Sequence, residues 1–415
     1  MTLSEELKWR GFINQTTIKD LSILDGQVLT FYHGFDASAD SQTVGNLAAM
    51  MLDRAFLRHG HKAILLAGGA TSLIGDPGGK DTERPLQDEQ TVARNVEMAE
   101  QQLKRVFTGY DFTPVNNLDW FKDMSVLHFL RDIGKHFSMT PLVQRDYIAK
   151  RIGEDSVGIS YTEFSYTLLQ GYDFLKLFED NGVTLQLSGA DQWGNCLSGV
   201  ELVRRVKGKE VNALTCPLII NEASGKKFGK TEEGAVWLDP EKTSPTQFYQ
   251  FWINADDAGV EKYLKIFTEL GREEIEQIMA EHKTAPQERK AQTRLAEEVT
   301  ALVHGKDAVE FAKKITGYLT SQVSLNDADD ASIQEIRKAL PSVKVQQNGS
   351  VVEALVQSGL AESNGEARRL LAGNAVYVNN SPITKENFEA SDFQNNRLLL
   401  RRGKALKDSA LIELA

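Results

Sequence analysis

The sequence predicts a parallel β-sheet covered by helices, followed by a helical region and a small mixed α/β module. Three observations support this prediction. Apolar strand-like runs alternate with amphipathic stretches in the first half of the chain. Over 245–319 glycines are few and apolar residues recur at three- and four-residue spacing. A polar linker at 346–350 then precedes a helix–helix–hairpin pattern, and 415 residues suffice for two or three domains with separate cores.

Five apolar runs are candidate strands of the sheet, and amphipathic stretches at 47–58 and 97–107 lie between them. The five candidate strands are 28–35, 63–67, 113–116, 184–187 and 214–220. This alternation is typical of strand–helix–strand units, so we expect the strands to run parallel.

The C-terminal part changes character twice. An acidic stretch at 326–330 interrupts the helical region. In the module, a short apolar helix at 351–358 precedes a second helix at 363–371, where Ser363 and Glu366 have the spacing of a capping box. A strand-like run at 375–378 and a turn follow. Two arginines of the second helix either form a basic ridge that binds an RNA backbone or lie on a solvated face of the helix. These arginines are Arg368 and Arg369.

Composition excludes several classes of protein. The hydrophobic and charged fractions, 41% and 25%, are those of an ordinary globular protein. A net charge of −11 argues against non-specific coating of nucleic acid. From residue 347 onward acidic and basic residues are equal in number, so the acidity belongs to the first 346 residues. This asymmetry indicates that the tail is a separate module.

Neither a membrane span nor a metal site is indicated by the sequence. Apolar runs fall far short of the ~20 residues that a membrane-spanning helix needs. The N-terminal residues lack the basic and apolar regions of a secretory signal. Cys196 and Cys216 are too few for a disulfide framework, and no Cys/His cluster has zinc spacing. We therefore expect a cytoplasmic protein without a resident metal.

A glycine-flanked basic segment at 225–231 follows the last candidate strand. Lys227 and Lys230 lie three residues apart in it, and Thr231 follows. Flanking glycines make such a loop mobile, and its ammonium groups suit the charge that develops on a leaving pyrophosphate. The alternative, a lysine-rich surface turn, remains open from this segment alone.

A polar stripe interrupts an otherwise apolar helix-like stretch at 162–173. Tyr166, Gln170 and Asp173 occur at i, i+4 and i+7, so all three project from one face of a helix. They form either a solvated face or one wall of a pocket that binds an ammonium group and a hydroxyl by directed hydrogen bonds.

Two glycine-rich turns follow candidate strands. The turn at 68–77 places Asp76 near the carboxyl end of its strand, although its spacing is that of neither a P-loop nor a dinucleotide-binding loop. Lys80 and Arg84 come next in a polar segment. At 188–195, Asp191 and Gln192 lie where they could reach a ribose and a substrate carbonyl, unless the segment is a plain turn.

The first candidate strand runs directly into a helix at 31–47. Its hydroxyl groups lie near a helix N-terminus, which favours phosphate binding.

These motifs, in this order, resemble those of bacterial tyrosyl-tRNA synthetases, which are class I aminoacyl-tRNA synthetases, along essentially the full length. The matching stretches are Trp9-Arg10-Gly11 with 14–17, Tyr32–Asp40, Gly68–Pro77, Tyr166–Asp173, Asp191–Asn195 and Lys227–Thr231. The tail resembles an S4 RNA-binding domain. The resemblance implies a Rossmann-like catalytic domain at 1–225 with a helical insertion at about 121–157. It also implies a phosphate loop and linker at 226–240, an all-α anticodon-recognition domain at 241–340, and an α+β S4 domain at 347–415.

The resemblance also implies roles for individual residues. Tyr32 and Asp173 would bracket the phenol hydroxyl of substrate tyrosine, and three residues would bind its ammonium group, namely Asp76, Tyr166 and Gln170. Gln192 would face the substrate carboxylate. ATP would be held by Gly34, Asp36, Gly45, Asn46, Gly189 and Asp191. The leaving pyrophosphate would be stabilised by Lys227, Lys230 and Thr231, assisted by Lys80 and Arg84.

The implied reaction is tyrosine activation by ATP, accompanied by Mg²⁺, followed by transfer of tyrosine to the 3′ end of tRNA(Tyr). No acid or base is required, because the attacking carboxylate is already ionised. The resemblance implies a homodimer, with an interface in the insertion. For tRNA binding the candidates are Arg204, Arg205, Lys207 and Lys209, besides Arg368 and Arg369.

One signature departs from the family. Its His-x-Gly-His motif is here Thr43-Val44-Gly45-Asn46, so the first imidazole is lost. We hypothesise that Thr43, Ser38 and the helix N-terminus share its contact with the outer phosphate. His33 stands where a small residue is common; it would reach the ribose or merely pack. Two rival functions remain open. One is a catalytically impaired RNA-binding paralogue, which the altered motif would explain, and the other is an enzyme of this fold specific for tryptophan or a tyrosine analogue.

Overall fold

The chain folds into two compact units. A computed structural model describes residues 1–78, 85–152, 158–231, 234–403 and 408–415. The first unit comprises 1–243 with 252–303, and the second comprises 244–251 with 304–415. Among the described residues, no helix combines the length and apolar character needed to cross a membrane.

A six-stranded sheet forms the centre of the first unit, in the order β1-β6-β5-β2-β3-β4. Its strands are β1 (Gln15–Thr16), β2 (Thr30–Asp36), β3 (Lys62–Gly68), β4 (Phe112–Asn116), β5 (Leu185–Gly189) and β6 (Asn212–Cys216). All neighbouring pairs are parallel except β1 with β6. The predicted fold class, a parallel sheet with connecting helices, is confirmed. From β2 the chain adds β3 and β4 on one side of the sheet and β5 and β6 on the other, so the strand order reverses between β2 and β5. Ligands bind at such a point in open α/β sheets.

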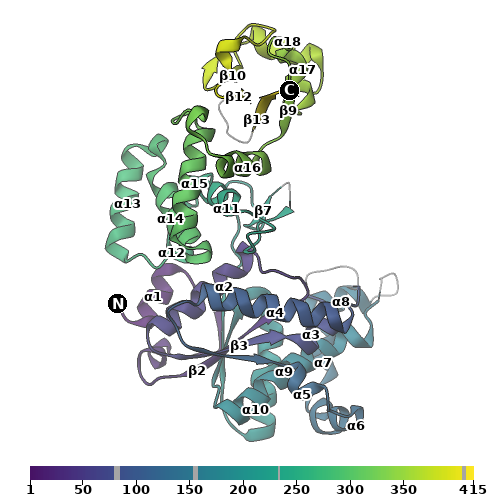
Figure 1. Ribbon diagram of the computed structural model, residues 1–415. Helices are drawn as coiled ribbons and strands as arrows, with labels where there is room; N and C mark the ends of the chain where they lie inside the picture. Colours follow the sequence, from purple (N-terminus) through teal and green to yellow (C-terminus); the bar gives the residue numbers. More distant parts are fainter. Residues whose placement is uncertain (79–84, 153–157, 232–233, 404–407) are drawn as a thin grey trace. The chain divides into compact units, whose positions relative to one another are not determined.

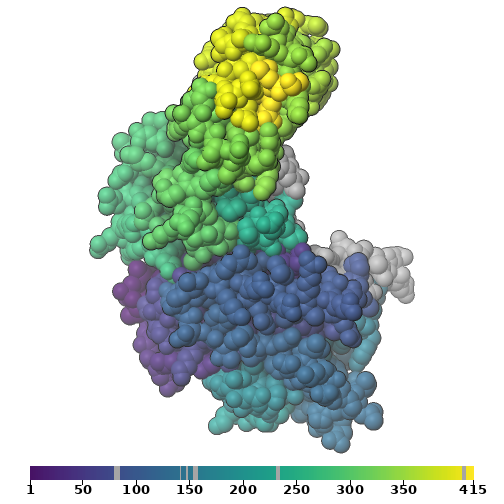
Figure 2. All heavy atoms as spheres, in the orientation of Figure 1, coloured from purple at the N-terminus to yellow at the C-terminus, as the bar shows by residue number. Residues whose placement is uncertain are grey.

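Helices cover both faces of this sheet (Figure 1). Helices α2 (Val44–Arg58) and α4 (Glu89–Val106) lie on one face, and α9 (Tyr161–Asn181) and α10 (Trp193–Lys207) on the other. Neighbouring residues of a strand point to opposite faces, so His33 meets α2 whereas Tyr32 packs near Phe174 of α9. Figure 2 shows that packed side chains hide the sheet from the viewing direction.

Shorter elements complete the first unit. Helix α3 (Gly69–Ile74) follows β3, and the short helix α5 (Leu118–Phe121) comes soon after β4. The predicted insertion, at about 121–157, contains α6 (Val126–His128), α7 (Met139–Val143) and α8 (Asp146–Ile152) with a π-helical turn at Phe129–Ile133. Strands β7 (Lys230–Thr231) and β8 (Gly234–Ala235) form a small hairpin. The helical part contains α12 (Val260–Phe267), α13 (Arg272–Thr284) and α14 (Lys290–His304).

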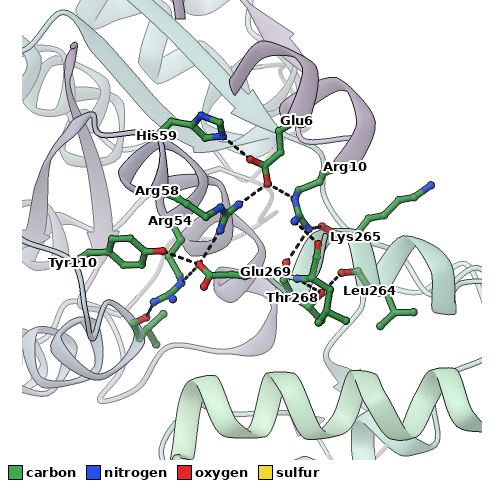
Figure 3. Close-up of polar contacts among 12 residues, drawn as sticks. Glu6, Arg10, Arg54, Arg58, His59, Tyr110, Leu264, Lys265, Thr268 and Glu269 are labelled. Carbon is green, nitrogen blue, oxygen red and sulfur yellow. Dashed lines mark hydrogen bonds and ion pairs between the residues drawn. The ribbon is translucent and has the colours of Figure 1, made fainter. Parts of the chain in front are cut away.

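A buried polar network joins the helical part to the sheet domain inside the first unit (Figure 3). Arg10, at the end of α1 (Leu3–Arg10), donates hydrogen bonds to three backbone oxygens after and within α12, those of Lys265, Thr268 and Leu270. The same guanidinium donates to Glu6 at 2.6 Å. Glu6 also accepts from Arg58 and His59 at the end of α2, so one carboxylate connects α1 to α2.

The second unit includes most of α11 (Pro245–Ile253), then α15 (Lys306–Leu319), α16 (Asp330–Ala339) and a five-stranded sheet ordered β11-β10-β12-β13-β9. Its strands are β9 (Ser342–Val345), β10 (Val376–Val378), β11 (Ser381–Pro382), β12 (Arg397–Arg402) and β13 (Ser409–Leu414). Helices α17 (Val351–Gln357) and α18 (Asn364–Ala372) pack on it around an apolar core. Asp329 caps α16, so part of the acidic stretch begins a helix.

Candidate functional site

A cleft of about 370 Å³ lies at the carboxyl ends of β2, β3, β5 and β6. It includes the β2–β5 boundary, where the winding of the sheet reverses. Most of the predicted substrate-binding residues line it: Tyr32, Gly34, Asp36, Gly45, Asn46, Asp76, Tyr166, Gln170, Asp173, Gly189, Asp191 and Gln192. Thr43 and Lys227 line it as well. The structure thus brings together segments that lie nearly 200 residues apart in sequence.

Asp173 lines the cleft and is only 2% exposed. Its carboxylate accepts hydrogen bonds from Trp120 Nε1 at 2.9 Å and from Asn117 Nδ2 at 3.2 Å. Burial raises the pKa of the Asp173 carboxyl to about 8, although these two hydrogen bonds lower it. A carboxyl group held in this way has a fixed orientation at the cleft and can form a further hydrogen bond with a ligand hydroxyl.

Three buried polar atoms at the cleft have no hydrogen-bond partner among the residues that the structure describes: the Tyr32 hydroxyl, Gln170 Oε1 and Gln186 Oε1. Tyr32 and Gln186 are paired across β2 and β5, so both side chains extend from the same face of the sheet. An unsatisfied buried polar atom costs about 1–3 kcal/mol. Such a concentration at one cavity indicates that a polar ligand supplies the missing partners.

Asp76 and Gln192 form a second polar group at the cleft. Gln192 Nε2 donates to Asp76 at 2.6 Å, and Asn195 donates to Gln192 Oε1 at 3.0 Å. Asn195 is in turn held by Thr167 at 2.8 Å and by Arg145 at 3.3 Å. The hydrogen bonds therefore fix the orientation of the Gln192 amide before any substrate binds.

Glycines line the part of the cleft that the sequence assigns to ATP. A Cβ atom at Gly189 would lie 2.7 Å from Asp191 Oδ1, so a larger residue there would displace that carboxylate. Asp36 accepts hydrogen bonds from the Ser38 backbone N–H at 2.9 Å and from the Ser38 hydroxyl at 3.0 Å. Ser38 itself does not line the cleft; it lines a neighbouring hollow with Arg94 and Gln87.

The altered signature forms a capping box at the start of α2. The Thr43 hydroxyl donates to Asn46 Oδ1 at 2.8 Å, and the Thr43 backbone N–H donates to the same oxygen at 2.9 Å. The two residues that stand in place of histidines therefore bind one another at the mouth of the cleft. Because the Thr43 hydroxyl donates its proton to Asn46, only its oxygen lone pairs face other partners in this arrangement.

The segment at 225–231, here called the lysine loop, contacts α2 on one side and the helical part of the first unit on the other. Phe228 packs against Tyr263, Trp252 and Phe267, with ring centroids 4.3, 5.4 and 5.7 Å away. Gly229 has a φ of +81°, and a Cβ there would lie 3.1 Å from Val44. Lys227, next to the buried Phe228, is exposed at the cleft. The side chains of Lys230 and Thr231, and the whole of Lys80 and Arg84, lie outside the described residues.

The predicted tRNA-binding residues lie elsewhere. At the end of α10, Arg204 and Arg205 both pair with Glu201, and Lys207 pairs with Glu179. The arginines lower the pKa of Glu201 to about 2. Arg368 and Arg369 lie on α18 of the second unit, as predicted for the tail helix. Lys209, just after α10, is exposed.

Several residues of the site were not predicted from sequence. Asn117 and Trp120, which hold Asp173, follow β4 in a segment that has no glycine turn or charge pattern. Gln186 lies inside a predicted strand, and a lone glutamine among apolar strand residues was its only signal. Arg145 lies in the insertion, far from the motifs whose residues it supports.

Comparison with known proteins agrees with this geometry. Residues 25–317 match the family described as tRNA synthetases class I (W and Y), and residues 332–407 match the Tyrosine–tRNA ligase SYY-like C-terminal domain. Tyrosine–tRNA ligase from Bacillus caldotenax is 47% identical over 389 residues, 91% of each chain. Tyrosine–tRNA ligase 1 from Photorhabdus laumondii is 44% identical over 417 residues, 97% of each chain.

A solved structure of a C-terminally truncated mitochondrial tyrosyl-tRNA synthetase from Aspergillus nidulans aligns with a TM-score of 0.68 and 31% identity. The alignment covers 75% of this chain and 92% of that one. Fold and cleft are thus those of a class I tRNA synthetase. Within that class, the chain belongs to the tyrosine–tRNA ligase family. The predicted family and enzyme class are confirmed, and members of the family use ATP as a substrate together with tyrosine and tRNA.

Proposed function

We propose that the cleft activates L-tyrosine with ATP, giving tyrosyl-adenylate and pyrophosphate, and then transfers tyrosine to the 3′ end of tRNA(Tyr). The observation that supports this most strongly is the set of unpartnered polar atoms around Asp173. The phenol hydroxyl and the ammonium group of tyrosine would together provide hydrogen-bond donors for the two amide oxygens and a partner for the Tyr32 hydroxyl.

Substrate tyrosine would lie with its phenol hydroxyl between Tyr32 and Asp173. Its ammonium group would be bound by Asp76, Tyr166 and Gln170, and Gln192 would face its carboxylate. A pocket that pairs a hydroxyl rejects phenylalanine, because its own buried polar groups then stay unpaired. Trp120 and Asn117 contribute by keeping the Asp173 carboxylate oriented.

ATP would lie over the carboxyl ends of β2 and β5. The glycines Gly34, Gly45 and Gly189 allow close approach, and Asp36, Asn46 and Asp191 would bind the adenosine and the α-phosphate region. Mg²⁺ would enter with ATP, held mainly by phosphate oxygens. Among the described residues no cluster of three or more His, Cys, Asp or Glu side chains offers a separate metal site.

The tyrosine carboxylate would attack the α-phosphate in line with the departing pyrophosphate. The fixed Gln192 amide would keep the nucleophile in position. Lys227, Lys230 and Thr231 would stabilise the charge on the leaving group, with Lys80 and Arg84 assisting. Thr43, Ser38 and the N-terminus of α2 would contact the outer phosphate in place of the missing imidazole, with the Thr43 hydroxyl proton turning from Asn46 Oδ1 to a phosphate oxygen.

We also propose a cytoplasmic homodimer whose interface lies in the insertion. Val126 and Leu127 of α6 are 72% and 79% exposed, and Leu130 next to them is 45% exposed. Neighbouring exposed apolar side chains of this size are typical of interaction surfaces. For tRNA, Arg204, Arg205, Lys207 and Lys209 would meet the acceptor stem. Arg368 and Arg369 of the S4 domain would contact the RNA backbone.

The altered Thr43–Asn46 signature favours one alternative, an RNA-binding paralogue without catalysis. Aminoacylation of tRNA(Tyr) transcript with labelled tyrosine separates the two functions, with filter binding of the same tRNA as a second measurement. We expect tyrosyl-tRNA to accumulate with the wild type and not with Asp173→Ala. Tight tRNA binding without any aminoacylation by the wild type would contradict the proposal and favour the paralogue.

A further inference from the structure

The first half of the lysine loop is one arm of a short hairpin. Ile220 and Lys227 pair as an antiparallel bridge, and the Phe228 N–H donates to the Ile219 carbonyl oxygen at 2.9 Å. The Asn221 N–H donates across the turn to a further carbonyl oxygen at 2.8 Å. Because the two arms are hydrogen-bonded to one another, a group that holds the turn of this hairpin also determines where Lys227 lies.

Two side chains of the helical part hold this turn. Asn221 Nδ2 donates to Asp256 Oδ2 at 3.0 Å, and the Tyr263 hydroxyl donates to the same oxygen at 2.9 Å. The Glu222 N–H donates to the Tyr263 hydroxyl oxygen at 3.3 Å. Asp256 lies between α11 and α12, and Tyr263 lies on α12. The pair, here called the Asp256–Tyr263 clamp, thus contacts two consecutive residues of the turn.

The clamp is itself held in one arrangement. Tyr263 is fully buried, and burial together with the neighbouring Asp256 carboxylate raises the pKa of its phenol above the ordinary value. The hydroxyl therefore keeps its proton and donates it. Asp256 Oδ1 accepts from the Gly259 N–H at 2.7 Å. A Cβ at Gly259 would lie 2.4 Å from the Tyr263 hydroxyl oxygen, so the glycine leaves the room that the phenol occupies.

The ring of Tyr263 also contacts the other arm of the hairpin. Its centroid is 4.3 Å from that of Phe228, which is buried. Lys227 directly precedes Phe228 and lines the cleft. Gly229 directly follows Phe228, and a Cβ there would lie 3.1 Å from Val44 at the start of α2. A single tyrosine therefore holds the turn by its hydroxyl and the loop by its ring.

The hydrogen bonds of the clamp provide an orientation that ring packing does not. Burial of apolar surface is non-directional, so the buried Phe228 ring alone would let the hairpin tilt. Hydrogen bonds weaken steeply when they are misaligned, and three of them meet at Asp256 and Tyr263. The clamp therefore fixes the direction in which the hairpin presents Lys227 to the cleft.

We propose that Tyr263 and Asp256 are positioning residues for the activation step, because they keep Lys227 at the cleft while charge develops on the leaving pyrophosphate. The proposal rests on the function proposed above. Preorganised charge acts only when it is in place, and a misplacement of about 1 Å can cost up to about 10² in rate. Pyrophosphate leaves in activation, whereas AMP leaves when tyrosine passes to tRNA. The clamp should therefore act on the first step and not on the second.

The decisive variant is Tyr263→Phe, which keeps the ring contact with Phe228 but loses both hydrogen bonds of the hydroxyl. We expect the single-turnover rate constant of adenylate formation, measured by quenched flow, to fall about tenfold. The Kd for tyrosine should stay within about twofold, since none of the clamp residues lines the cleft. The rate constant of tyrosine transfer from preformed enzyme-bound adenylate to tRNA(Tyr) should also stay within about twofold.

Tyr318→Phe is the matched control. Tyr318 is 2% exposed, and its hydroxyl donates to the Asp327 carbonyl oxygen at 2.9 Å, far along the chain from the lysine loop. Both variants therefore lose a buried tyrosine hydroxyl, but only Tyr263→Phe should slow adenylate formation. Equal rates of adenylate formation in the two variants would overturn the inference. An equal loss in the transfer step or in tyrosine affinity would also overturn it.

Two further measurements test the clamp. Trypsin cleavage after Lys227, followed by mass spectrometry without substrates, should be about five- to tenfold faster in Tyr263→Phe than in Tyr318→Phe, because loosening the hairpin exposes this bond. Cleavage at equal rates would contradict the clamp. Asp256→Asn has one acceptor oxygen in place of two and should also slow adenylate formation. The double variant should be little slower than either single one, since the two residues act as a unit, and fully additive losses would contradict this.

The two proposals fail in different ways. A wild type that forms no adenylate would refute the proposed function, and the trypsin comparison, which needs no activity, would still test the clamp.

Discussion

Replacing Asp173 by asparagine should make the protein more stable at alkaline pH than the wild type. The Asp173 carboxyl is buried, and its pKa is raised to about 8 from an ordinary value of 3.8. In the unfolded chain the carboxyl would lose its proton near pH 4. Between these two values the folded state holds a proton that the unfolded state has released, so wild-type stability falls as pH rises from about 4 to about 8.

The magnitude follows from the size of this shift. About four pKa units correspond to roughly 5 kcal/mol at full ionisation. Relaxation and water entry reduce such penalties, so we expect about 2–4 kcal/mol. An asparagine at the same position has nearly the same shape and never ionises. The gain in unfolding free energy of Asp173→Asn over the wild type should therefore be small near pH 5 and should increase by about 2–4 kcal/mol by pH 8.5.

Urea unfolding at pH 5 and pH 8.5, followed by far-UV circular dichroism without tyrosine, measures the difference. Asp180→Asn is the control, because Asp180 lies exposed at the end of the same helix and should show no such gain. Tyrosine affinity should be lost in Asp173→Asn, which checks that the pocket was altered. A stability difference between Asp173→Asn and wild type that is the same at both pH values would refute the reasoning.

Three other perturbations test separate parts of the structure. Thr43→His restores the missing imidazole and should raise the rate of adenylate formation up to about tenfold, measured by quenched flow. An unchanged rate would discard the hypothesis that Thr43, Ser38 and the helix N-terminus share that contact. Arg10→Ala removes one of the three donors to the buried Glu6 carboxylate and the side-chain donor to three backbone oxygens, so the unfolding free energy should drop by about 3–5 kcal/mol. Lys8→Ala, on the exposed face of α1, should change it little. Phe228→Ala removes three ring contacts and should lower kcat for exchange without changing the Kd for tyrosine; a change in tyrosine affinity alone would contradict the placement of the loop.

Much of the first unit was predictable because local signals there agree with the fold. Each predicted strand overlaps an observed one, and boundaries differ by a few residues. The run at 214–220 shows why: β6 ends at Cys216, since Pro217 lacks the N–H that a ladder needs. Polar residues after apolar strands identified most of the cleft, because parallel strands end at one edge of a sheet.

The unpredicted features depend on contacts between distant segments. β9 is four residues long and pairs in parallel with β13, which comes more than 60 residues later in the sequence. The sequence of β9 alone therefore gives little indication of a strand. Trp120 and Asn117 matter only because the fold brings them to Asp173. The buried contact between His33 and Asp53, twenty residues apart, was likewise not predicted.

The most direct test of the central claim is ATP–pyrophosphate exchange by the wild type with tyrosine, phenylalanine or tryptophan as the amino acid. Exchange should depend on tyrosine, and kcat/KM for phenylalanine should be lower by about 10⁴–10⁵, the range established for sites of this enzyme class that pair the substrate hydroxyl. Equal exchange with phenylalanine would contradict recognition of the phenol by Tyr32 and Asp173. Absence of exchange with all three would contradict the assignment of this cleft to amino-acid activation.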